Sequence, residues 1–216
     1  MQIIITILIL SKSLLSIANA TDYTLKQFLG PQVGVENYYS GTDGSKLKLV
    51  GISHKNDKSL MLEETFYYPK ESLLLNMKSH QTRVYELFVS GDKMIKKSEE
   101  KQEVVLQDPR IEDNWLIKGS MLDIRPKNAN HKWREIDTTC KIVDIKEGDV
   151  LGQRTLVITK KCEYREISSI FIRTEKYGKG IGLIEQTQNV VEENGEIKGI
   201  YKLQLEKINV VTCIGN

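Results

Sequence analysis

The sequence is poor in the residues that build metal sites and nucleophilic centres. It has only three histidines, at positions 54, 80 and 131, and three cysteines, Cys140, Cys162 and Cys213. These residues form neither a C-x-x-C nor an H-E-x-x-H spacing, so no metal ligand is predicted. No G-x-S-x-G segment marks a nucleophilic serine. We therefore predict no catalytic residue, no cofactor-binding residue and no cofactor, and we expect that the protein is not an enzyme.

Charge of one sign is also lacking. The chain has 31 Lys and Arg against 29 Asp and Glu, a net charge of +2. A near-neutral chain has no electrostatic reason to bind a polyanion, so a nucleic-acid partner is not expected.

Long apolar runs are absent after the first residues of the chain. The run from Ile3 to Leu10 is interrupted by Lys12, which leaves it shorter than the ~20 residues of a membrane span. The A-x-A pattern that ends at Ala20 is typical of a cleaved signal peptide. We predict a signal peptide over residues 1–20 and a secreted or periplasmic (cell-envelope) location with no membrane span after cleavage. The alternative is a segment that is retained as an anchor.

Two of the cysteines predict a disulfide. Export makes a disulfide possible, and Cys140 and Cys162 flank two β-branched runs on either side of a turn-rich centre. Pairing them in an antiparallel hairpin closes the chain on a three-residue loop, 150–152, whose glycine takes the left-handed conformation. This register places Val143 beside Thr159. The crosslink would contribute about 3 kcal/mol on the chain-entropy model.

Cys213 remains without a partner in this scheme. It predicts an intermolecular disulfide or a reactive thiol, and the alternative is an incidental cysteine on a frayed tail.

The chain is rich in strand signals. Apolar runs at 47–52, 60–68, 83–89, 170–177 and 201–206 are separated by turn signals, without helices of crossover length. This pattern indicates antiparallel pairing. We predict a mainly β fold with one curved antiparallel sheet, a partly open barrel or half-barrel, in a single domain over residues 21–216. The less regular stretch 107–133 would join two halves of that sheet.

Two local signals refine this prediction. Residues 21–29 predict a short N-terminal helix, capped by Thr21 or Asp22 and ended by Pro31. Asn194-Gly195 is the strongest hairpin signal in the chain.

The segment "KYGKGIGLIEQ" carries three alternating glycines, Gly178, Gly180 and Gly182. Their G-x-G-x-G spacing is not that of a nucleotide-binding loop, and no helix signal follows it. On a strand, alternate glycines would lie on one side and leave room for another backbone or a bulky ring. We predict a structural glycine stripe, with Trp115 and Trp133 as the rings that pack over it.

Several segments together resemble a group of uncharacterised secreted bacterial proteins and lipoproteins. The segments are "EVVLQDPRIEDNW", "WREI", the Cys140 hairpin, "KYGKGIGLIEQTQ", "YKLQLEKI" and the early "FLGPQVGVENYYSGTDGSK". The group has patterns similar to "iLkePlkvGtsW" and "YYApgVGlVk". This chain departs from it at Asp113-Asn114, in a longer hairpin loop and in lacking a lipid-attachment cysteine. The resemblance implies a β-rich envelope domain without a known catalytic residue.

Three functional hypotheses follow. The first is an exported, non-catalytic domain that binds a ligand or a protein partner through one face of the sheet. The second is a structural or assembly protein of the cell envelope. The third is a hydrolase with an unrecognised site, which would need Glu63 or Glu175 buried beside another carboxylate in a cleft.

Aromatic residues are the candidate ligand contacts under the first hypothesis, and core residues otherwise. They are Tyr38, Tyr39, Phe66, Tyr67, Tyr68, Tyr85, Phe88, Trp115, Trp133, Phe171 and Tyr177.

Overall fold

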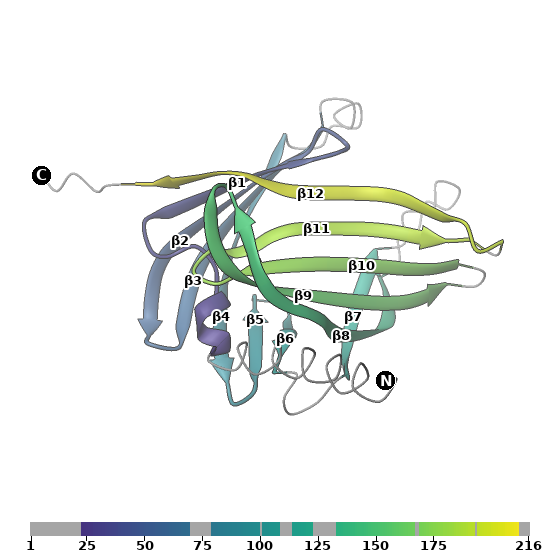
Figure 1. Cartoon of the computed structure of the whole chain (residues 1–216), viewed down its shortest axis with the longest axis horizontal. Coiled ribbons are helices and arrows are strands. Elements are labelled where there is room, and N and C mark those ends of the chain that lie inside the picture. Colours follow the sequence, from purple (N-terminus) through teal and green to yellow (C-terminus); the bar gives the residue numbers. More distant parts are fainter. Residues whose placement is uncertain are drawn as a thin grey trace, which may run out of the picture.

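The computed structural model describes residues 23–69, 79–99, 101–108, 114–122, 133–166, 169–192 and 194–211. Within these residues the chain forms one antiparallel sheet of twelve strands and a single short 3-10 helix, η1 (Leu25–Phe28) (Figure 1). The strands are β1 (Val35–Gly41), β2 (Lys46–Asn56), β3 (Ser59–Tyr67), β4 (His80–Ser90), β5 (Lys93–Lys97), β6 (Gln102–Gln107), β7 (Asn114–Leu122), β8 (Trp133–Val150), β9 (Gln153–Glu166), β10 (Ser169–Gly178), β11 (Gly182–Val191) and β12 (Ile197–Val210).

The strands form a meander that is joined in the middle by the two ends of the chain. Their order is β6-β5-β4-β3-β2-β1-β12-β11-β10-β9-β8-β7, so the first strand pairs with the last. The edge strands β6 and β7 come within 8 Å of each other at their Cα atoms. The sheet is therefore strongly curved and nearly closed, which confirms the predicted mainly β, barrel-like fold. In Figure 1 the long strands β9 to β12 run across the direction of β4 to β6.

Alternating burial explains why these segments are strands. In β12, Leu203 and Leu205 are buried while Gln204 and Glu206 are exposed, as their period of two predicts. The inward-facing apolar residues of both halves meet in two clusters, one around Phe28 and one around Tyr39.

The N-terminal segment lies inside this core. Thr24 caps η1 through a capping box with Gln27, and Leu25 and Phe28 are buried. The predicted N-terminal helix is thus present as a single 3-10 turn. Its cap is Thr24, and not Thr21 or Asp22, which lie outside the described residues.

The disulfide between Cys140 and Cys162 is formed and joins directly opposite residues of β8 and β9. The predicted hairpin needs one correction. A bulge at Val143 shifts the register by one residue, so Thr159 pairs with Asp144, and the loop has two residues, Leu151 and Gly152. Both loop residues have positive φ, 52° and 79°, as a type I′ turn requires. The left-handed conformation predicted for the loop glycine is confirmed.

The other local predictions have mixed outcomes. Gly195 has a φ of 81° in the turn between β11 and β12, so the predicted hairpin is confirmed. The irregular stretch contains the edge strand β7, which pairs with β8. Cys213 and the predicted signal peptide (residues 1–20) lie outside the described residues, and the single-domain extent stays a prediction. No described helix has the length and hydropathy of a membrane span.

The three alternating glycines lie across a hairpin turn, and not along one strand as predicted. Gly178 ends β10, Gly180 is in the turn and Gly182 begins β11. Gly180 and Gly182 have φ of +78° and +84°, which only glycine adopts readily. The turn is held against the N-terminal segment, because Gly180 N–H donates to the Gln27 carbonyl at 2.7 Å and a Cβ on Gly182 would lie 2.3 Å from the Gly30 Cα.

The group that covers the glycines also differs from the prediction. Backbone at Gly30 lies over Gly182, and the Ile184 side chain lies over Gly178. The prediction that a tryptophan ring packs over Gly182 is therefore wrong. The alternative prediction, that another backbone approaches this glycine, is correct. The side chains of Trp115 and Trp133 lie outside the described part of the structure.

Candidate functional site

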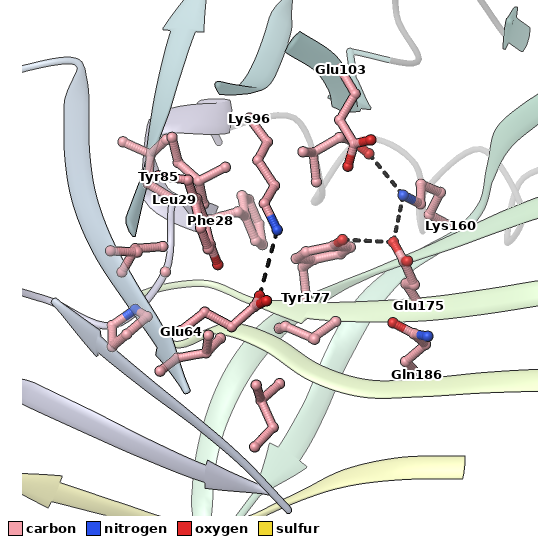
Figure 2. A pocket seen from close by; sticks show the side chains of 18 of the residues that line it. Phe28, Leu29, Glu64, Tyr85, Lys96, Glu103, Lys160, Glu175, Tyr177 and Gln186 are labelled. Carbon is pink, nitrogen blue, oxygen red and sulfur yellow. Dashed lines mark hydrogen bonds and ion pairs between the residues drawn. The ribbon is translucent and has the colours of Figure 1, made fainter. Parts of the chain in front are cut away.

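A cavity of about 220 Å³ lies between the two halves of the curved sheet (Figure 2). Its apolar wall includes Phe28 of η1, Leu62 of β3, Leu87 of β4, and Leu183 and Leu203 of β11 and β12. The inward faces of the strands supply this wall, since these leucines follow the period of two. Charged residues from both halves complete the lining, which is unusual for the interior of so small a domain.

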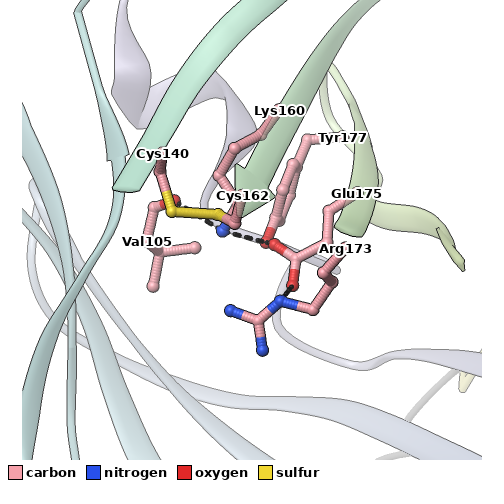
Figure 3. The surroundings of a disulfide bond; sticks show 7 residues. All are labelled: Val105, Cys140, Lys160, Cys162, Arg173, Glu175 and Tyr177. Atoms are coloured by element: carbon pink, nitrogen blue, oxygen red, sulfur yellow. Dashed lines mark hydrogen bonds and ion pairs between the residues drawn. A yellow bond between two sulfur atoms is a disulfide. The ribbon is translucent and has the colours of Figure 1, made fainter. Parts of the chain in front are cut away.

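The first polar group is a buried ion cluster from β9 and β10. Lys160 and Glu175 are directly opposite in the strand register, and their side chains are 2% and 8% exposed. They form an ion pair, and Lys160 Nζ also donates to the Val105 carbonyl at 3.0 Å. Arg173 and Tyr177 share the inward face of β10 with Glu175 (Figure 3). The Arg173 Nε lies 3.1 Å from Glu175 Oε1, and the Tyr177 hydroxyl donates to Glu175 Oε2 at 2.6 Å.

These contacts determine the protonation states of the cluster. Burial alone would raise the pKa of Glu175, but the charges of Lys160 and Arg173 and the bonds from Lys160 and Tyr177 outweigh it and lower the pKa to about 2. Burial lowers the pKa of Lys160, an effect that Glu175 opposes. The Glu175 carboxylate raises the pKa of Arg173. Glu175 is therefore an anion at neutral pH, held between two cationic residues.

The second polar group lies on the opposite wall. Lys96 of β5 pairs with Glu64 of β3 at 3.5 Å, and its ammonium lies 3.8 Å from the centre of the Tyr85 ring. Tyr85 is 6% exposed, and burial raises the pKa of its hydroxyl well above the usual value, so this hydroxyl stays protonated.

Two polar groups of the lining have no hydrogen-bond partner among the described residues. They are the Tyr85 hydroxyl and the Gln186 carboxamide. In Figure 2, Tyr85 lies near the pair of Lys96 and Glu64, and Gln186 lies near Glu175. Neither group is fully enclosed by protein, so each can form a hydrogen bond with a molecule in the cavity. The cavity therefore offers an apolar wall with a few hydrogen-bonding positions, which is the usual composition of a small-molecule site.

The arrangement does not match the carboxylate pair that the hydrolase hypothesis needs. Glu175 is buried in the cavity wall, but the groups bonded to it are Lys160, Arg173 and Tyr177. A carboxyl with a pKa of about 2 is a weak base and cannot serve as an acid near neutral pH. Glu63 is not a lining residue, whereas its neighbour Glu64 is, because adjacent strand residues face opposite sides.

No group of three or more His, Cys, Asp and Glu is gathered for a metal ion within the described part of the chain.

The site combines predicted residues with residues that the sequence did not single out. Of the aromatic candidates, Tyr85 and Tyr177 line the cavity, while Tyr39 is buried in the second core cluster. Lys160 and Arg173 were not anticipated. A signal for Arg173 exists in the i, i+2, i+4 series Arg173, Glu175, Tyr177, which places polar groups on one face of a strand.

Comparison with known proteins gives two structural matches. No family model and no curated protein matches the chain. An inferred exported protein with a YmcC-like fold from Bacteroides fragilis is 9% identical, with a TM-score of 0.48 over 84% of this chain and 98% of that chain. An inferred lipoprotein from Parabacteroides distasonis is 10% identical, with a TM-score of 0.46 over 84% of this chain and 98% of that chain.

Proposed function

We propose that this protein is an exported, non-catalytic domain that binds a small molecule in the cavity on the inner face of its curved sheet. The observation that carries the proposal is the cavity itself, in which an apolar wall meets two polar groups, Tyr85 and Gln186, whose side-chain hydrogen-bonding atoms have no partner among the described residues. The binding surface is the inner sheet face, in line with the first hypothesis from the sequence.

The size of the cavity limits the ligand. A volume of about 220 Å³ exceeds the ~150 Å³ that holds benzene and is below the ~300 Å³ at which drug-sized ligands begin. A single ring with a short substituent is the size that fits. The ion clusters around the cavity are each internally paired, so the lining supports a mainly apolar body with one polar end.

The proposed location rests on the sequence of the first residues. The apolar run and the A-x-A pattern ending at Ala20 support export to the periplasm, the cell envelope or the medium. The disulfide of Cys140 with Cys162 supports an oxidising compartment. Cleavage after Ala20 is checked by mass spectrometry of the exported protein, which reads the mature N-terminus directly.

The binding proposal is tested with toluene and benzyl alcohol as ring-sized probes. We expect both to raise the unfolding temperature and to shift the NMR signals of lining methyl groups, because a ligand that binds only the folded state stabilises it. Leu183→Trp should abolish both effects by filling the cavity. Val84→Trp is the matched control, since Val84 is 48% exposed and does not line the cavity.

Two results would contradict the proposal. One is that wild-type protein shows no methyl shifts with either probe at millimolar concentration. The other is that Leu183→Trp, with an unchanged circular dichroism spectrum, still binds like the control. If Leu183→Trp does not fold, the wild-type methyl shifts decide, because only shifts clustered at the lining residues support the cavity.

A further inference from the structure

Arg173 presents hydrogen-bond donors that its own ion cluster does not use. Its Nε faces Glu175, and the two terminal nitrogens are turned away from that carboxylate (Figure 3). Neither terminal nitrogen has a partner among the described residues, although Arg173 lines the cavity. Its side chain is 38% exposed, so these nitrogens are accessible to a molecule that enters.

The surroundings hold the guanidinium in a fixed direction. Glu175 is anchored by Lys160 and Tyr177, and its Oε1 forms an ion pair with the Arg173 Nε, which makes no hydrogen bond among the described residues. Lys160 is itself anchored to the Val105 carbonyl. A buried cluster of this kind is a poor source of net stability, because apolar residues of similar volume serve as well or better. The cluster does, however, restrict the Arg173 side chain before a ligand arrives. Ligand binding therefore costs less side-chain entropy than it would at a mobile arginine.

The charges that line the cavity balance. The three carboxylates of Glu64, Glu103 and Glu175 face the three cations of Lys96, Lys160 and Arg173. Glu103 also forms an ion pair with Lys101 at 2.8 Å, and its charge, after that of Glu175, raises the pKa of Arg173. Arg173 therefore offers a ligand its two terminal donors, and not a net positive charge of the cavity.

We infer that the ligand is a small monocarboxylate whose carboxylate binds the two terminal nitrogens of Arg173 and whose apolar part fills the cavity. The planar guanidinium matches a carboxylate with two parallel hydrogen bonds. Gln186, opposite Glu175 in the strand register, can donate to the same ligand group through its amide. This inference rests on the proposed function and adds the chemical class of the ligand.

The test compares benzoate with benzamide, which has the same shape and no charge. NMR titration at pH 7 should show wild-type protein binding benzoate at least about tenfold more tightly, since a charged hydrogen-bond pair exceeds a neutral one by this factor or more. Arg173→Gln should remove the preference and change the dissociation constant for benzamide by less than about threefold. Lys176→Gln is the matched control, because Lys176 is the next cation after Arg173 along β10 and does not line the cavity. It should keep the tenfold preference.

Each other outcome decides against the inference. If benzamide binds as tightly as benzoate, the monocarboxylate class is wrong while the proposed function stands. If neither binds but toluene does, the monocarboxylate class is wrong while the proposed function stands, and if toluene also fails to bind, both are wrong. If inorganic phosphate displaces benzoate at equal concentration, the site is a general anion site. If Arg173→Gln retains the preference, another residue holds the carboxylate.

A second variant covers the case in which Arg173→Gln does not fold. Arg173→Lys keeps the charge without the planar guanidinium, and an unchanged preference for benzoate in this variant overturns the inference.

Discussion

Protonation of Glu175 should weaken the fold by an amount that its surroundings determine. Burial alone would raise its pKa, but the charges of Lys160 and Arg173 lower it from 4.5 to about 2. A pKa that is lower in the folded state gives stability that is present above pH 4.5 and lost as the pH falls towards 2. The shift corresponds to about 3 kcal/mol, and about 2 kcal/mol of this is lost between pH 6 and pH 3.

Urea unfolding at these two pH values measures the effect. The free energy of unfolding of the wild type should fall by about 2 kcal/mol more than that of Glu175→Gln, because the other carboxylates titrate in both proteins and cancel. Glu147→Gln is the control, since Glu147 and its partner Arg154 are 62% and 81% exposed, and it should show the full wild-type loss. If Glu175→Gln alone does not fold, combining it with Lys160→Met removes the unpaired buried charge. An equal loss in wild type and the Glu175 variant would refute the lowered pKa.

Two further predictions concern the covalent and steric contacts of the fold. Gly182→Ala should lower the free energy of unfolding by at least about 1 kcal/mol more than Gly180→Ala. Both glycines have positive φ, but only a Cβ at position 182 would meet the Gly30 backbone. Equal losses in urea unfolding would show that this contact is absent. Replacing both Cys140 and Cys162 by alanine should lower the free energy of unfolding by about 3 kcal/mol, since the bond closes a loop across 22 residues; an unchanged urea midpoint would contradict this.

Elements that depend on neighbours in sequence were predictable. The strand with Leu203 and Leu205 follows from alternation alone, and the turn at Gly195 follows from the Asn-Gly pair. The disulfide was also accessible, because Cys140 and Cys162 flank one hairpin and their pairing is nearly local. The register beyond them was not, since a bulge at Val143 depends on how the two strands twist against the rest of the sheet.

The candidate site was less accessible. Lys160 and Glu175 are 15 positions apart and meet because β9 and β10 pair in one particular register. Their ion pair also needs Val105 from the other half of the sheet, whose carbonyl accepts a bond from Lys160. Single-sequence patterns show which face a residue takes, but not which faces meet across a core.

By itself, the sequence determined the mainly β fold, the antiparallel connections, the disulfide and the absence of familiar catalytic spacings. These properties depend on local alternation, turn residues and short loops. Only the tertiary structure decided that the glycine segment is a hairpin turn covered by Gly30, and that Arg173 faces a cavity with free donors. Both result from the closing of the sheet upon itself, which brings the N-terminal segment and the last strands together. The hydrogen bond from Asn37 to the Ile181 carbonyl, for example, joins residues 144 positions apart.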